Sequence, residues 1–113
     1  MAQLKRGDIV TVAWSGDFGK PRPAVIVQAN QLTESGIGSI VVCQITSDLQ
    51  PVSILRIAVI PTAENGLLKP SQIMVEKIFA AKREKCGAVM GTMDDASMDA
   101  LGEALMFVVG LMG

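Results

Sequence analysis

Histidine and tyrosine are absent from this chain of 113 residues, and cysteine occurs only as Cys43 and Cys86. Without histidine, one chain cannot build a Ser-His-Asp or Cys-His nucleophile system. The two cysteines lie far apart and form no C-x-x-C pair. The sequence therefore predicts no metal site and no cofactor.

Segments that would direct the chain to a membrane are also missing. The N-terminus lacks a charged-then-apolar signal peptide, and the longest apolar stretches are much shorter than a membrane span. We therefore expect a cytoplasmic protein without membrane association, in which both cysteines are reduced. Cys43 lies in the apolar run of residues 40–45 and is expected in the core.

Apolar residues, in contrast, are abundant. Half of the residues are hydrophobic and the mean hydropathy is +0.42. Residues 1–113 fit one domain, and a domain of this size cannot bury so much apolar surface by itself. We expect a homodimer, the alternative being a monomer with an unusually large core. The net charge of -1 argues against a long duplex-binding face but allows a local basic cluster to touch a few nucleotides.

The pattern of apolar residues predicts a mainly β protein with a C-terminal helix. Short strands are expected at residues 8–14, 22–28, 40–45, 53–60 and 71–81, although the last segment also fits a helix by pattern. Thr92 and Asp95 match the N-cap and N3 positions of a capping box, and apolar residues then recur at helical spacing. The helix end, residues 105–112, is apolar all round and should be buried by the sheet and by a second subunit. We predict a small SH3-like barrel of antiparallel strands.

The second and third predicted strands place polar residues at one end of a hairpin. Their loop is centred on Glu34, and Arg22 and Thr46 each lie twelve positions from it. Antiparallel pairing would bring these two residues opposite one another. The same rim would hold Lys20, Ser47 and Asp48.

Such a rim suits phosphate chemistry. A guanidinium can grip a phosphodiester and stabilise the charge of its transition state, and hydroxyl groups can orient the phosphate. A metal-free RNase can use the 2′-OH of the RNA itself as nucleophile, so no nucleophilic side chain is required. The alternative is that Arg22 is a surface residue at the start of an edge strand and that Thr46 and Ser47 cap a turn.

These residues resemble a known family. Residues 5–10 (KRGDIV) followed by residues 22–27 (RPAVIV) resemble the N-terminal signature of MazF/PemK/Kid toxins, which belong to type II toxin–antitoxin systems. Residues 44–47 (QITS), 71–73 (SQI) and 90–93 (MGTM) resemble later motifs of the same family, in the same order. The match covers nearly the whole chain.

The resemblance implies a homodimeric endoribonuclease that cuts single-stranded mRNA at short specific sequences and is neutralised by a cognate antitoxin. It implies a catalytic role for Arg22, as acid or transition-state stabiliser, and for Thr46 and Ser47, which would position the phosphate. Lys20, Trp14, Asp17, Lys69 and Gln72 are the expected substrate-binding residues. Trp14 and Phe18 are the aromatic candidates for base stacking near the rim, while core packing is the alternative for Trp14.

One family position departs from the pattern. Some members carry an acid, proposed as the general base, where this chain has Ser71. Asp17, Glu34 and Asp48 are then the candidates for that role. A CcdB-like gyrase poison and a catalytically inactive SH3-like interaction module are the competing interpretations; the chain lacks the C-terminal tryptophan of the gyrase poisons, and Ser71 favours the inactive module.

Overall fold

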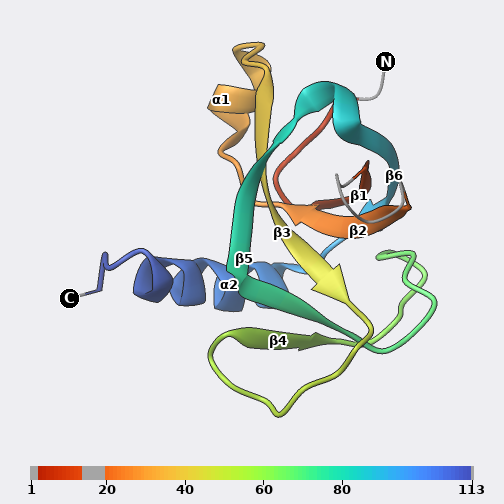
Figure 1. Ribbon diagram of the computed structural model, residues 1–113, viewed down its shortest axis with the longest axis vertical. Helices are drawn as coiled ribbons and strands as arrows, with labels where there is room; N and C mark the ends of the chain where they lie inside the picture. Colours follow the sequence, from red (N-terminus) through yellow and green to blue (C-terminus); the bar gives the residue numbers. More distant parts are fainter. Residues whose placement is uncertain (1–2, 14–19, 113) are drawn as a thin grey trace.

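An antiparallel sheet of six strands forms the body of this computed structural model, which describes residues 3–13 and 20–112 (Figure 1). The strands lie in the order β4-β5-β3-β2-β1-β6, so the sheet is open between β4 and β6. The elements in chain order are β1 (Asp8–Ala13), β2 (Pro21–Ile26), α1 (Asn30–Glu34), β3 (Ser39–Thr46), β4 (Arg56–Val59), β5 (Ser71–Lys82), the 3₁₀ helix η1 (Arg83–Lys85), β6 (Cys86–Thr92) and α2 (Asp95–Val108). The predicted mainly β, small barrel-like fold with a C-terminal helix is confirmed.

Strand β5 is the longest strand of the sheet. It shows that residues 71–81, which also fitted a helix by pattern, form a strand. Its first part pairs with β4 and with the end of β3, and its second part pairs with the start of β3. An irregularity in the β3–β5 register separates the two parts, and Figure 1 shows β5 changing direction along its length. Residues 71–75 are buried in succession, as expected where both faces of a strand are covered.

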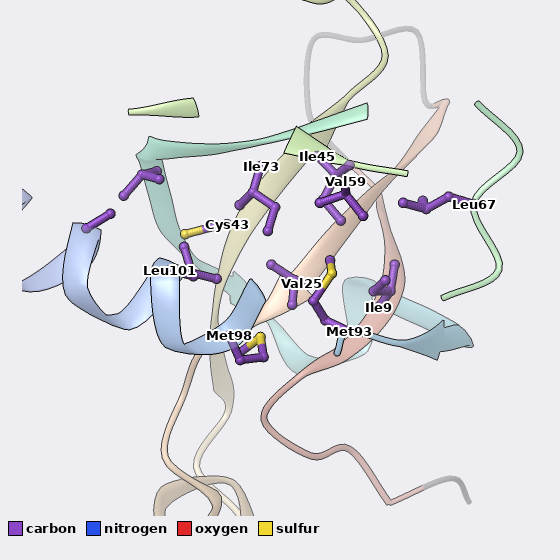
Figure 2. Packing of buried hydrophobic residues seen from close by; sticks show 12 residues of the cluster. Ile9, Val25, Cys43, Ile45, Val59, Leu67, Ile73, Met93, Met98 and Leu101 are labelled. Atoms are coloured by element: carbon purple, nitrogen blue, oxygen red, sulfur yellow. The ribbon is translucent and has the colours of Figure 1, made fainter. Parts of the chain in front are cut away.

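Helix α2 covers one face of the sheet. Strand residues such as Ile9, Val25 and Ile73 meet Met98 and Leu101 of the helix in one buried cluster (Figure 2). Cys43 belongs to this cluster and is fully buried, so its predicted core position is confirmed. Burial of each large side chain contributes about 1.5–3 kcal/mol, and the cluster therefore holds the helix to the sheet.

The opposite face of the sheet carries a second buried cluster. Its strand residues alternate with those of the first cluster, as the two-residue period of a strand requires. The members are Val10, Val12, Ala24, Ile26, Ile40, Val42 and Ala81, with Leu4, Phe79 and Cys86 packed against them. The strands are therefore apolar on both faces over much of their length.

Helix α2 begins two residues later than the capping-box pattern predicted. Its N-cap is Asp94, whose carboxylate accepts hydrogen bonds from the backbone N–H of Ser97 at 3.0 Å and from the Ser97 hydroxyl at 2.8 Å. Thr92 is instead the last residue of β6, where it pairs with Asp8. The prediction failed because pairing with β1 keeps Thr92 extended.

Within the described residues, no helix has the length and hydropathy to cross a membrane.

The turn between β4 and β5 packs against β6. Asn65 is buried, and its side-chain oxygen accepts from the backbone N–H groups of Thr62 and Leu67, both at 3.0 Å. Gly66 has a φ of +68°, and a Cβ there would collide with the carbonyl oxygen of Met90. The turn at Asn65 and Gly66 thus depends on glycine for both conformation and space.

Candidate active site

The register of β2 and β3 confirms the predicted hairpin. The strand pairs are Ala24 with Gln44, Val25 with Cys43 and Ile26 with Val42. The two residues of each pair lie equally far from Glu34 along the sequence, as predicted for a hairpin whose loop is centred on Glu34. The ladder ends at Ala24 and Gln44, two positions short of Arg22 and Thr46; continued to them, the same register would bring these two residues opposite one another. Helix α1 occupies the connection without changing this register.

Three functional candidates follow one another across adjacent strands. Thr46 of β3 is directly opposite Gln72 of β5, and Arg22 of β2 is paired on its other side with Val12 of β1. Paired residues point to the same face of a sheet. Val12 belongs to the second cluster, so this row lies on the face away from α2. Thr46 and Gln72 therefore place a hydroxyl and an amide side by side where β3 stops, and the continued β2–β3 register would set the guanidinium of Arg22 next to them.

The hydroxyl of Thr46 is held by the turn that follows it. Thr46 is half-buried, and its Oγ1 accepts a hydrogen bond of 3.0 Å from the backbone N–H of Asp48. Accepting this bond leaves the hydroxyl hydrogen available to donate elsewhere. Ser47 and Asp48 are exposed and follow directly in the chain. The turn therefore offers two hydroxyl groups and a carboxylate at the rim.

The amide of Gln72 faces the same turn. Gln72 is only 4% exposed, and its side chain donates to the carbonyl of Gln50 at 2.9 Å and accepts from the N–H of Gln50 at 3.1 Å. Its Oε1 also accepts from Nη1 of Arg56 at 3.2 Å. The buried amide is thus engaged with protein groups through both its oxygen and its nitrogen, as a buried polar group requires.

Two lysines flank the row at the same sheet end. Lys20 immediately precedes β2 and Lys69 lies two residues before β5, and both are exposed. Because β2 and β5 begin where β3 ends, both lysines lie at that end. The substrate-binding candidates Trp14 and Asp17, like Phe18, fall within residues 14–19, outside the described part of the chain.

Ser71 and the carboxylates that are candidates for the general base lie at different places in the fold. Ser71 is buried and its hydroxyl donates to the carbonyl of Lys69 at 2.8 Å, so it serves the backbone at the start of β5. Glu34 ends α1 in the connection between β2 and β3, and the length of β3, about 23 Å for seven strand steps, separates that end of the hairpin from Thr46. Glu34, a candidate general base from the sequence, therefore lies at the wrong end of the hairpin for that role. Asp48 is the described acid that remains beside Thr46.

No three histidine, cysteine, aspartate or glutamate side chains of residues 3–13 and 20–112 gather into a group that could hold a metal ion. The thiol of Cys43 is also unsuited to nucleophilic chemistry. Burial, and to a smaller extent the Glu76 carboxylate, together raise its pKa to about 12. The thiol therefore stays protonated near neutral pH.

Comparison with known proteins identifies the family. Residues 5–109 match the sequence profile of the PemK-like, MazF-like toxins of type II toxin–antitoxin systems. The chain belongs to this family. The resemblance seen in the sequence motifs is thereby confirmed.

A curated relative and two solved structures show how far the likeness of this MazF-like toxin extends. A probable endoribonuclease MazF of Mycolicibacterium smegmatis is 31% identical over 111 residues, which is 97% of this chain and 100% of the relative. A mycobacterial endoribonuclease, solved in complex with its cognate antitoxin, superposes with a TM-score of 0.79 at 18% identity, covering 96% of each chain. MazE-MazF from Deinococcus radiodurans gives 0.78 at 13% identity, covering 97% of this chain and 98% of the other. At these identities the two structures show a shared fold.

Arg56 is the site residue of this MazF-like toxin that the sequence did not reveal. It lies on β4, and its Nη1 reaches both Gln72 and the carbonyl of Asp48. In the sequence it is one arginine within an apolar strand, and no motif connects it to residues 46–50. Its contacts with Gln72 and Asp48 depend on the pairing of β4 with β5.

Proposed function

We propose that this MazF-like toxin is an endoribonuclease that cleaves single-stranded mRNA at specific short sequences, without a metal ion. The β2–β3 register supports it most directly, because its continuation past Ala24 and Gln44 would bring Arg22 beside Thr46. Family membership and the relative named as a probable endoribonuclease MazF support the same reaction class. We expect it to act in the cytoplasm, where mRNA is met.

In this proposal the RNA supplies its own nucleophile. The 2′-OH attacks the adjacent phosphorus, the bond to the 5′-oxygen of the next nucleotide breaks, and a 2′,3′-cyclic phosphate forms. The leaving 5′-oxygen takes up a proton, from Arg22 acting as acid or from water, and departs as a 5′-OH. Arg22 stabilises the charge that develops on the phosphate oxygens. Thr46 and Ser47 donate to a non-bridging oxygen, and Lys20 and Lys69 attract the flanking phosphates.

The proton of the 2′-OH needs an acceptor. Among the described residues Asp48 is the carboxylate best placed for it, because its backbone N–H is bonded to Thr46 Oγ1. Asp17 is the other acid considered from sequence. We expect Asp48→Asn to lower kcat with little change in KM; an equal kcat in this variant, with a loss in Asp17→Asn, would transfer the role to Asp17.

The purified protein should cleave a single-stranded RNA in EDTA and leave 2′,3′-cyclic phosphate ends. Arg22→Ala should lower kcat by about a hundredfold or more, the typical loss when a transition-state donor is removed. Arg83→Ala is the matched control, since the Arg83 guanidinium donates to the carbonyls of Ile37 and Thr33, at the start of β3. No cleavage at micromolar enzyme, or full activity in Arg22→Ala, would contradict the proposal. Intact RNA with trapped gyrase–DNA complexes in arrested cells would indicate a gyrase poison instead.

We also propose that two copies of the chain associate through the end of α2. Ile54, Phe107 and Met112 are each more than half exposed and line one groove of about 270 Å³ between α2 and the segment before β4. Such a contiguous apolar surface marks an interaction site. Within one chain the groove stays uncovered, so the expected second subunit would bury it.

A cognate antitoxin is the second proposed partner. The mycobacterial endoribonuclease and the MazF from D. radiodurans were each solved in complex with an antitoxin or MazE, and both share this fold. A chain encoded beside this one, mixed with it in equal amounts, should abolish RNA cleavage and co-purify with the dimer. RNA cleavage that continues in a stable mixture would argue against neutralisation by that chain.

A further inference from the structure

Arg56 connects two strands to the turn beside the proposed catalytic residues. It lies on β4 opposite Met74 and is half-buried. Its Nη1 donates to Oε1 of Gln72 at 3.2 Å and to the carbonyl oxygen of Asp48 at 3.4 Å. A guanidinium in these contacts gives charge-assisted hydrogen bonds, which are stronger than those between neutral groups.

Gln72 holds the same turn at Gln50, two residues after Asp48. Its side-chain amide forms two hydrogen bonds with the backbone N–H and C=O of Gln50, as a neighbouring strand would. Gln72 is nearly fully buried and Gln50 is exposed, so these bonds are partly shielded from competing water. Arg56 bonds to the oxygen that also accepts from Gln50, so it fixes the orientation of the Gln72 amide.

The third attachment of the turn is Thr46 itself. Its Oγ1 accepts from the N–H of Asp48, while the carbonyl of Asp48 accepts from Arg56. The backbone of Asp48 is therefore held between Thr46 on one side and Arg56 on the other. Movement of residues 48–50 would release the Thr46 hydroxyl from its present rotamer.

We propose that Arg56 and Gln72 are positioning residues, which clamp residues 48–50 and thereby keep the Thr46 hydroxyl aimed at the scissile phosphate. The inference deepens the proposed RNA cleavage and rests on it for its catalytic purpose. It gives Gln72 a supporting task in place of direct contact with the substrate. It also assigns a role to an arginine outside every motif of the sequence.

Amide hydrogen exchange tests the clamp without RNA. In NMR spectra, the amide protons of Asp48 and Gln50 should exchange about tenfold faster in Arg56→Gln and in Gln72→Leu than in the wild type. Arg56→Lys, which retains a cationic donor, should restore part of the protection. Arg83→Gln is the matched control and should leave both amides unchanged. Unchanged exchange in both Arg56→Gln and Gln72→Leu would overturn the inference.

Kinetics test the purpose of the clamp. Arg56→Gln should lower kcat about tenfold or more while KM changes less than about twofold, because ground-state binding is retained. In a Thr46→Val background the same change should have little further effect, since both substitutions disable one hydroxyl. Fully additive losses would show that Arg56 acts independently of Thr46 and would overturn the inference.

The two experiments separate this inference from the proposed function. If the wild type cleaves RNA but the exchange rates and kcat of Arg56→Gln are unchanged, the clamp is wrong and the nuclease stands. If exchange accelerates as expected but the wild type cleaves no RNA, the nuclease proposal fails, and the catalytic purpose of the clamp fails with it.

Discussion

Thr46 of β3 lies directly opposite Gln72 of β5, and the two side chains hold one turn from its two ends. Thr46 binds the N–H of Asp48, and Gln72 binds both backbone groups of Gln50. The proposed catalytic hydroxyl is therefore part of a hydrogen-bonded turn built on the central strands of the sheet. A site supported in this way keeps its geometry more closely than one on an unsupported loop.

Association through α2 can be tested at Phe107, which is 56% exposed and lines the groove beside β4. Phe107→Asp should convert the dimer into a folded monomer in sedimentation velocity, because a buried unpaired charge would oppose association. Met106→Asp is the matched control, since Met106 is an exposed apolar residue of α2 outside the groove lining. A wild-type monomer, or a Phe107→Asp dimer of equal affinity, would contradict this interface.

The close approach of Gly66 to β6 predicts an unequal response of two glycines. Gly66 and Gly36 both have positive φ, but only at Gly66 would a Cβ meet the backbone of Met90. Gly36→Ala should cost about 1 kcal/mol through its backbone conformation alone. Gly66→Ala should cost about 1–3 kcal/mol more, through overpacking against a carbonyl. Urea denaturation of both variants gives the comparison, and equal losses would show that β6 yields to the added methyl group.

The N-cap of α2 predicts a pH-dependent contribution to stability. The backbone N–H of Ser97, and then its hydroxyl, lower the pKa of Asp94 in the folded protein. The stabilisation is therefore present above the unfolded pKa of about 3.9 and is lost as the pH falls through the folded pKa. Asp94→Ala should cost about 1 kcal/mol at pH 7, and the difference from wild type should shrink toward pH 3.

Urea unfolding at the two pH values measures this effect. Asp99→Ala, which removes an exposed acid from the middle of the same helix, is the control. A cost for Asp94→Ala that stays the same at pH 3 would show that the charge of the cap contributes nothing.

Cys43 should be inert in the native protein. Burial raises its pKa to about 12, so the thiolate is scarce at pH 8. In a Cys86→Ala variant, a thiol reagent should label Cys43 about a thousandfold more slowly than free cysteine, and rapidly once urea unfolds the chain. Fast labelling under native conditions would show that the sheet opens over Cys43 without global unfolding.

Sequence periodicity was sufficient for the hairpin that carries the site. The register of β2 and β3 follows from equal distances to Glu34, because each strand must turn its apolar residues toward the cores. It also located Cys43 in the core and predicted α2 from residues at helical spacing. These features depend on interactions that are local or repeat along one strand.

Elements without a burial pattern could not be predicted in this way. Residues of β6 are mostly exposed and include two glycines, so only the free edge of β1 makes the segment a strand. The same pairing moved the start of α2 from Thr92 to Asp94. Backbone pairing with a distant edge leaves no signal in side-chain type.

By itself the sequence determined the family, the mainly β fold and the register of β2 with β3. Only the tertiary structure decided that Gln72 bonds to the backbone of Gln50 and that Arg56 bonds to Gln72. The reason is physical: register within one hairpin is fixed by the periodicity of two neighbouring segments. Contacts between β4, β5 and the turn after β3 depend instead on how three distant segments pack, which no local pattern records.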